Sequence, residues 1–213
     1  MPPQIQPPNP EWPLASRRLR DIVFSMQSEE RPVSLELQAD AAIPTEPSPQ
    51  PCLDPAMFRD MFSGPPSGVT VVTTLDETDV PVGLTVSAVM SASLAPPPLA
   101  VCPPNANHTL EAIPSRGAFP VNFLASSQSD VSDSFAFGNQ DKFSAVAWGK
   151  SPHVEAPVLE DVRAHAECSV FRVIETGDHP IIVGRILSGA VTEDRPLTYC
   201  SRQHVDLVYK LAS

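Results

Sequence analysis

The sequence predicts a mainly β fold, arranged as a closed or nearly closed antiparallel barrel with a few short helices. Two observations lead to this prediction. Seven apolar segments rich in β-branched residues follow one another after residue 54, and such residues favour strands. Only short helical patterns separate them, without regular alternation of strands and helices, which argues against a doubly wound parallel sheet.

Composition divides the 213 residues into two regions. Residues 1–51 hold 11 of the 26 prolines, and proline lacks the backbone donor that helices and central strands need. We therefore expect a Pro-rich N-terminal extension over 1–51 and a globular domain over 52–213. Apolar spacing permits a short amphipathic helix over 17–26. A flexible extension with a transient helix and a segment that wraps over a partner both remain open.

Short helices are predicted at three places in the globular region. Asp54 is placed as the N-cap of the first helix, and Pro55 stands in its first turn. Asn107 and Ser127 are the expected N-caps of the other two. The predicted helices cover residues 54–62, 107–114 and 127–137.

The predicted strands follow the first helix. They cover residues 68–75, 82–91, 98–102, 118–124, 166–175, 180–191 and 196–200. A polar turn at 76–79 joins the first two strands. Successive side chains of a strand point to opposite faces. One face of this strand pair is therefore expected to pack in a core, while the Thr and Ser hydroxyls of the other face are free to bind a ligand.

Charge and missing motifs exclude several functions. The net charge of −11 and the pI near 4.7 argue against nucleic-acid binding, which needs a basic surface. The chain has no GxGxxG, no GxxxxGK[ST] and no GxSxG motif. Its five histidines lack HExxH or HxH spacing, so no catalytic metal is expected.

The expected location is the cytoplasm, away from membranes. No targeting segment is evident, and no run approaches the roughly 20 apolar residues of a membrane span. The four cysteines lie far apart and form no CxxC pair. We expect them to be free thiols in a reducing compartment.

Eight short motifs are distributed over the globular region. They are GVTVVTT at 68–74, GLTVS at 83–87, SASLAPP at 91–97, NHT at 107–109, FPVNFLA at 119–125, Gln128, DKF at 141–143 and GDHPIIVG at 177–184. In this order and spacing, the chain resembles the flavin reductase family over about residues 58–207. The resemblance implies the FMN-binding split β-barrel, which is Greek-key-like and carries a few short helices.

The resemblance also implies the residues that bind flavin. Thr85, Val86, Ser87 and Ala88 match the segment that touches the isoalloxazine ring, although Ala88 replaces the family's second serine. The other cofactor-binding residues that the resemblance implies are Cys102, Asn107, Thr109, Asn122, Gln128, Lys142 and Phe143. Among these, Asn107, Thr109 and Lys142 are matched to the flavin phosphate, helped by the N-terminus of the following helix.

His179 matches the histidine of the family's GDH motif, which lies beside the nicotinamide of the reduced dinucleotide. The implied function is an NAD(P)H:flavin oxidoreductase, with His179 in the catalytic site, FAD or FMN as the flavin, and NADH or NADPH as the hydride donor. The reduced flavin would diffuse to a separate monooxygenase or halogenase. A homodimer is also implied. The alternatives are a flavin- or haem-binding split barrel without reductase activity, and a scaffold whose extension docks a larger enzyme.

Overall fold

The computed structural model describes residues 53–105, 107–137 and 141–207. The helix expected over 17–26 and the extension boundary near residue 51 lie outside these residues. Among the described residues, no helix has the length and apolar composition that crossing a bilayer requires. The described cysteines are Cys102, Cys168 and Cys200, and all three carry free thiols.

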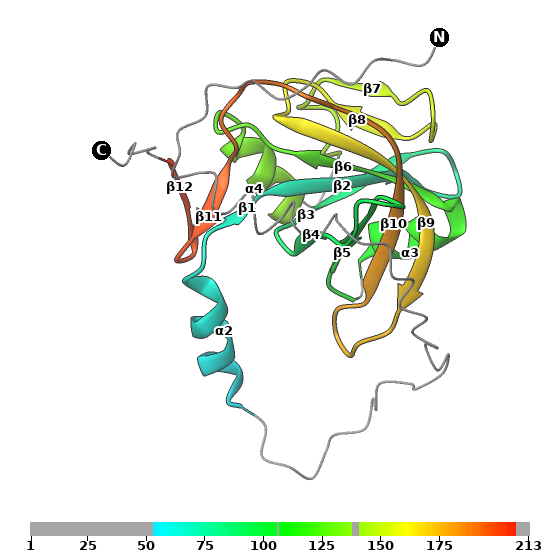
Figure 1. The fold of residues 1–213 in the computed structure, drawn as a ribbon. Helices are drawn as coiled ribbons and strands as arrows, with labels where there is room; N and C mark the ends of the chain where they lie inside the picture. The colour runs from blue at the N-terminus through cyan, green and yellow to red at the C-terminus, as the bar shows by residue number, and fades with distance from the viewer. Residues whose placement is uncertain (1–52, 106, 138–140, 208–213) are drawn as a thin grey trace. The chain divides into compact units, whose positions relative to one another are not determined.

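One antiparallel sheet forms the body of the structure (Figure 1). Its order is β3-β2-β6-β9-β10-β5-β4. The strands are β2 (Thr70–Leu75), β3 (Pro81–Val86), β4 (Val89–Ser91), β5 (Pro98–Val101), β6 (Ala118–Phe123), β9 (Ala164–Ile174) and β10 (Ile181–Val191). All six residues of β2 are buried, as expected for a strand covered on both faces.

The chain itself shows that this sheet is rolled up. Strands β3 and β4 are its two opposite edges, yet only Ser87 and Ala88 separate them in sequence. The three steps from Val86 to Val89 span at most about 11 Å, so the end of one edge strand must lie close to the start of the other. No ladder pairs β3 with β4 among the described residues. The barrel is therefore curled but split along the seam at Ser87–Ala88, which confirms the predicted barrel.

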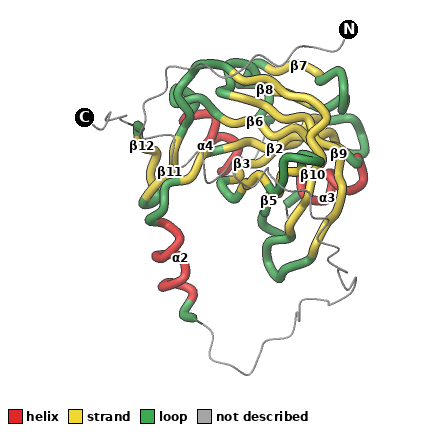
Figure 2. The backbone as a smooth tube through the Cα atoms, in the orientation of Figure 1, coloured by secondary structure: helices red, strands yellow, loops and turns green. Residues whose placement is uncertain are grey.

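Two smaller sheets accompany the barrel. β1 (Ser67–Gly68), β11 (Thr198–Cys200) and β12 (Gln203–Val205) form one of them, and β7 (Trp148–Lys150) and β8 (Pro157–Leu159) form the other. Figure 2 shows β11 and β12 next to each other, and β11 pairs with β1. The sequence patterns did not predict β7, β8 or β12, because strands of three residues are too short to show a period.

The three helices are α2 (Pro55–Ser63), α3 (His108–Arg116) and α4 (Ser129–Phe137). The predicted caps of the first two are confirmed, since the Asp54 carboxylate accepts from two N–H groups of α2 and the Asn107 side chain accepts from Thr109 N. Helix α4 begins at Ser129, so Gln128 precedes it and the prediction of Ser127 as its cap is wrong by one residue.

The predicted strand 82–91 is wrong in one respect, because the chain leaves the sheet at Ser87 and re-enters it at the other edge. The other predicted strands are confirmed to within three residues at each end. Gly184 is a position in this sheet that must lack a side chain. A Cβ on Gly184 would lie 2.5 Å from Phe119 Cζ, and Phe119 is fully buried. The bare backbone of β10 therefore lets the Phe119 ring fill the barrel core.

Candidate functional site

A cavity of about 470 Å³ opens beside the edge strand β3. It is lined by Val80, Pro81, Val82, Gly83, Asn107, His108, Thr109, Asp141, Lys142 and Phe143. Segments 80–83, 107–109 and 141–143 are far apart in sequence, and the fold brings them together. Four of the residues expected to bind flavin meet here, namely Asn107, Thr109, Lys142 and Phe143. They stay predictions as ligand contacts.

The start of α3 gives this cavity a positive end. Asn107 Oδ1 accepts from Thr109 N at 2.9 Å, which leaves other N–H groups of the first turn without an intrahelical partner. Such groups, together with the helix dipole, favour an anion. His108 is exposed and lines the same cavity, so it adds a basic side chain at the rim. Its Nε2 atom lies 3.4 Å from Asp76 Oδ2.

Lys142 brings the ammonium group of the cavity. Its Nζ donates to Gly83 O at 3.3 Å and to Phe135 O at 3.0 Å. An ammonium has three hydrogens, so one remains for a ligand. Burial lowers the pKa of Lys142 below its ordinary value. Phe143, next in the chain, packs its ring edge-on against Phe135, so its aromatic face serves the core.

Strand β3 connects this cavity to the seam of the barrel. Gly83 lines the cavity, and β3 continues to the exposed Ser87 and Ala88. The Thr85 hydroxyl donates to Ser132 O at 2.6 Å, and the Val86 side chain is buried in the core. The predicted ring contact of Val86 is therefore limited to its backbone. Ser87 and Ala88 are exposed at the seam, and neither lines the cavity beside β3, so their ring contacts stay predictions.

Cys102 joins the seam to the following loop. Its N–H donates to Ala88 O at 3.0 Å, and burial raises the pKa of its thiol. A neutral thiol is a weak nucleophile and a weak donor. Cys102 thus lies next to Ala88, and its backbone holds the loop against the seam, while its predicted contact with the cofactor stays a prediction.

His179 lies in the turn between β9 and β10. Its Nδ1 is 3.0 Å from Asp178 Oδ1, and the hydrogen bond from His179 lowers the pKa of the Asp178 carboxyl. An ionised carboxylate only accepts, so Nδ1 carries the hydrogen and Nε2 of the neutral ring is an acceptor. The turn also contacts the loop after β5, because Asn105 donates to Gly177 O and Asp178 O.

Among the predicted residues that do not line the cavity, Asn122 and Gln128 make structural hydrogen bonds. Asn122 is fully buried, and its amide donates to Val71 O and Thr73 Oγ1 while accepting from Leu159 N. The Gln128 side chain accepts from Ala125 N and donates to Glu160 O. The structure uses these amides to tie loops to the sheet, and neither Asn122 nor Gln128 lines the cavity beside β3.

The sequence patterns missed three residues of this region. Gly83 lines the cavity, and a Cβ there would lie 2.8 Å from Phe135 Cε1. His108 follows a helix cap, and a basic residue at a helix N-terminus was a signal for anion binding. Asn105 had no signal, because its partners lie 72 residues away.

A second cavity, of about 480 Å³, is lined by more acidic side chains than the first. Its lining includes the carboxylates of Glu160, Asp161, Glu167 and Asp194. Carboxylates repel phosphate, whereas Lys142 and the α3 N-terminus attract it. Of these two cavities, the one beside β3 therefore suits a phosphate-bearing ligand.

Comparison with known proteins gives a consistent match. The model of the "Flavin reductase like domain" family matches residues 62–207. A "Probable flavin reductase" of Rhizobium meliloti is 42% identical over 62% of this chain. The chain spans only 42% of that relative's length.

Two other relatives are matched over most of their length. The "Flavin reductase (NADH)" of Kitasatospora aureofaciens is 39% identical over 71% of this chain and 81% of its own. The "Flavin-dependent monooxygenase, reductase subunit HsaB" of Rhodococcus jostii is 34% identical over 81% of this chain and 85% of its own.

A solved structure adds a bound state. It is the NADH:FAD oxidoreductase SgcE6 of Streptomyces globisporus C-1027, in complex with NAD and FAD fragments. It is 26% identical to this chain, with a TM-score of 0.69, and the match covers 75% of this chain and 98% of that one.

Proposed function

The chain belongs to the flavin reductase-like domain family, and on this basis we propose that it is an NAD(P)H:flavin oxidoreductase. The observation that carries the proposal is the meeting of Lys142, the α3 N-terminus and the edge strand β3 at one cavity. Relatives named flavin reductase (NADH) and flavin reductase (NADPH) support this activity over ligand binding alone. The proposal concerns the globular domain over 52–213, with the extension over 1–51 as a separate region.

The residues present suit a flavin phosphate. The Asn107 amide, the Thr109 hydroxyl and the N–H groups of the first turn of α3 that the cap leaves unpartnered hold the phosphate oxygens. Lys142 places its remaining hydrogen on the same anion as a point charge. The seam from Thr85 to Ala88 borders the ring with Cys102 behind it. A bound flavin supplies the acceptor for a hydride.

His179 orients the hydride donor. Asp178 holds its Nδ1–H, so Nε2 accepts a hydrogen bond from the carboxamide of the nicotinamide. Hydride transfer needs no protein acid, but it does need the two reacting rings at near-contact distance. The role of this chain is therefore to bind both rings and to fix their orientation.

The proposed partner is a separate oxygenase or halogenase that receives reduced flavin. One relative is named a reductase subunit of a flavin-dependent monooxygenase, and one neighbour is the reductase component of a two-component tryptophan halogenase. The acidic chain suits transient encounters in the cytoplasm, the compartment that we propose. No basic surface for nucleic acid is expected at a net charge of −11.

We also propose a homodimer. Helix α2 has no buried residue, and its Met57, Phe58, Met61 and Phe62 are each more than half exposed. Phe171 and Leu187 add exposed apolar surface on β9 and β10. An apolar helix side exposed to this extent is uncommon on a monomer, and a second copy of the chain would cover it.

The first test is the consumption of NADH or NADPH by the purified protein, followed at about 340 nm with free FAD, FMN or riboflavin, because the reduced nicotinamide absorbs there. Rapid oxidation with one flavin is expected, and the comparison identifies the preferred flavin and dinucleotide. Folded protein that binds flavin but oxidises neither dinucleotide would overturn the proposal and favour a binding protein without reductase activity.

The extension is tested separately by deletion of residues 1–50. If turnover with free flavin survives while oxygenation by an added partner falls, the extension serves docking. If both rates stay at the parent level, a docking role for the extension is excluded.

A further inference from the structure

We propose that Asn105 is a positioning residue that fixes the turn carrying His179 against the flavin-binding side of the barrel. This inference deepens the proposed function and rests on it. Asn105 belongs to none of the motifs that predicted the site, and it does not line the cavity beside β3.

The contact is made twice by the same residue. Asn105 N donates to Asp178 O at 2.8 Å, and Asn105 Nδ2 donates to Gly177 O at 2.7 Å. Both distances lie at the short end of the usual range for N–H···O bonds. Two donors on neighbouring carbonyls hold the turn in position and in orientation, which a single bond would not do.

The accepting turn is locked within itself. Gly177 has φ +83°, a left-handed conformation that glycine adopts without strain. The Thr176 hydroxyl donates to His179 O, and His179 contacts Asp178 through Nδ1. Asn105 therefore holds a preformed turn, and any tilt of this turn moves the His179 ring with it.

The loop that carries Asn105 also connects two parts of the proposed flavin site. Cys102, three residues before Asn105, donates its N–H to Ala88 O at the barrel seam. Asn107, two residues after it, caps α3 at the cavity. Asn105 thus lies between the residues for the ring and for the phosphate, and it connects both to His179. The flavin contacts themselves do not require the Asn105 side chain.

The experiment compares the parent with Asn105→Ala and with Asn105→Asp, which keeps the shape but loses the donor when ionised. We expect the KM for NADH to rise roughly two- to tenfold in both variants, as for the loss of one hydrogen bond. The KM for flavin should stay within about twofold, because its contacts use other groups. Asn105→Gln retains the donor and should recover part of the NADH affinity.

The matched control is Gln203→Ala. It removes an exposed side-chain amide elsewhere in the structure, on β12, and should leave both KM values at the parent level. Parent-like KM values for NADH in the Ala and Asp variants would overturn the proposal. So would an equal rise in the KM for flavin, because the side chain would then support the flavin site.

A second readout is independent of activity. Amide hydrogen exchange of the turn at 176–182, measured without ligands, should be faster in Asn105→Ala than in the parent. Unchanged exchange would overturn the inference even if the parent is an active reductase. If the parent oxidises neither dinucleotide, the proposed function fails, and the exchange result still decides whether Asn105 holds the turn.

Discussion

His179 is held from both of its sides. Its carbonyl accepts from the Thr176 hydroxyl, and its Nδ1 faces the Asp178 carboxylate. The ring is half exposed, so Nε2 remains open to a ligand. These contacts orient the imidazole without burying it, which suits the proposed contact with a diffusing dinucleotide.

At this scale we predict that His179→Ala raises the KM for NADH by roughly three- to tenfold, because an oriented acceptor for the carboxamide is lost. The KM for flavin should change by less than about twofold, because His179 does not line the phosphate cavity. Steady-state kinetics with each substrate varied in turn measure both values. Equal KM values for NADH in variant and parent would show that His179 does not contact the dinucleotide.

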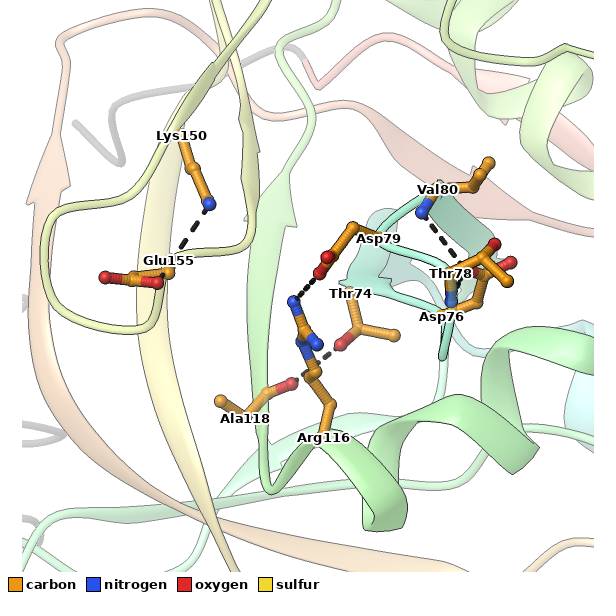
Figure 3. A network of polar contacts seen from close by, with 9 residues as sticks. All are labelled: Thr74, Asp76, Thr78, Asp79, Val80, Arg116, Ala118, Lys150 and Glu155. Carbon is orange, nitrogen blue, oxygen red and sulfur yellow. Dashed lines mark hydrogen bonds and ion pairs between the residues drawn. The ribbon is translucent and has the colours of Figure 1, made fainter.

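At the scale of elements, the hairpin β2–β3 clamps α3 at both of its ends. Asp79 pairs with Arg116 in the last turn of the helix, and Asp76 lies 3.4 Å from His108 in the first. Figure 3 shows the Asp79–Arg116 contact and the Asp76 carboxylate turned inward over its own hairpin. Asp76 Oδ1 accepts from Thr78 N, Thr78 Oγ1 and Val80 N. The start of α3 is thereby fixed at the cavity.

The clamp predicts a dependence of stability on acid. The hydrogen bond from Val80 N and those from Thr78 lower the pKa of Asp76 from 3.8 to about 2. Its contribution is therefore complete above about pH 4 and is lost as the pH falls through about 2. In urea unfolding, Asp76→Asn should lose less stability than the parent between about pH 5 and pH 2.

The control for this prediction is Glu77→Gln, a carboxylate of the same turn. It should follow the parent over the whole pH range. The same acid dependence in Asp76→Asn and in the parent would mean that Asp76 does not stabilise the folded state.

At the scale of the whole molecule, a short hairpin fixes the direction of α2. Ser201 N donates to Ser63 O, Cys200 Sγ contacts Gly64 O, and Arg202 pairs with Asp60. Ser201 and Arg202 have φ values of 51° and 64°, a left-handed pair that usually contains glycine. Arg202 occupies this position and forms the ion pair with Asp60 of α2. These contacts hold the helix while its apolar side stays exposed.

We predict that this apolar side joins two copies of the chain. The parent should elute as a dimer in size-exclusion chromatography with light scattering. Phe62→Glu should shift the mass towards the monomer, because a carboxylate in an apolar interface is strongly unfavourable. Ala56→Glu, on the opposite side of α2, should remain dimeric. A monomeric parent, or a Phe62→Glu variant as dimeric as the parent, would contradict the proposed interface.

Local patterns sufficed for much of this structure, and the reasons are visible in particular residues. Asp54 and Asn107 cap their helices with their own side chains, so their neighbours in sequence were enough to predict them. The break at Ser87 was not predicted, because it depends on closure of a seven-stranded sheet. Asn122 matched a motif for flavin, yet it is buried against Val71, Thr73 and Leu159, contacts that only the fold creates.

The hydrogen bonds of Lys142 have a consequence for how the protein would bind and release flavin. Two backbone carbonyls already accept hydrogens from its ammonium group, so this cation keeps its place without a counter-ion. In the proposed function, the cavity beside β3 therefore keeps its structure when flavin binds, is reduced and dissociates. Such a cavity suits a reductase whose flavin exchanges with solvent in every catalytic cycle.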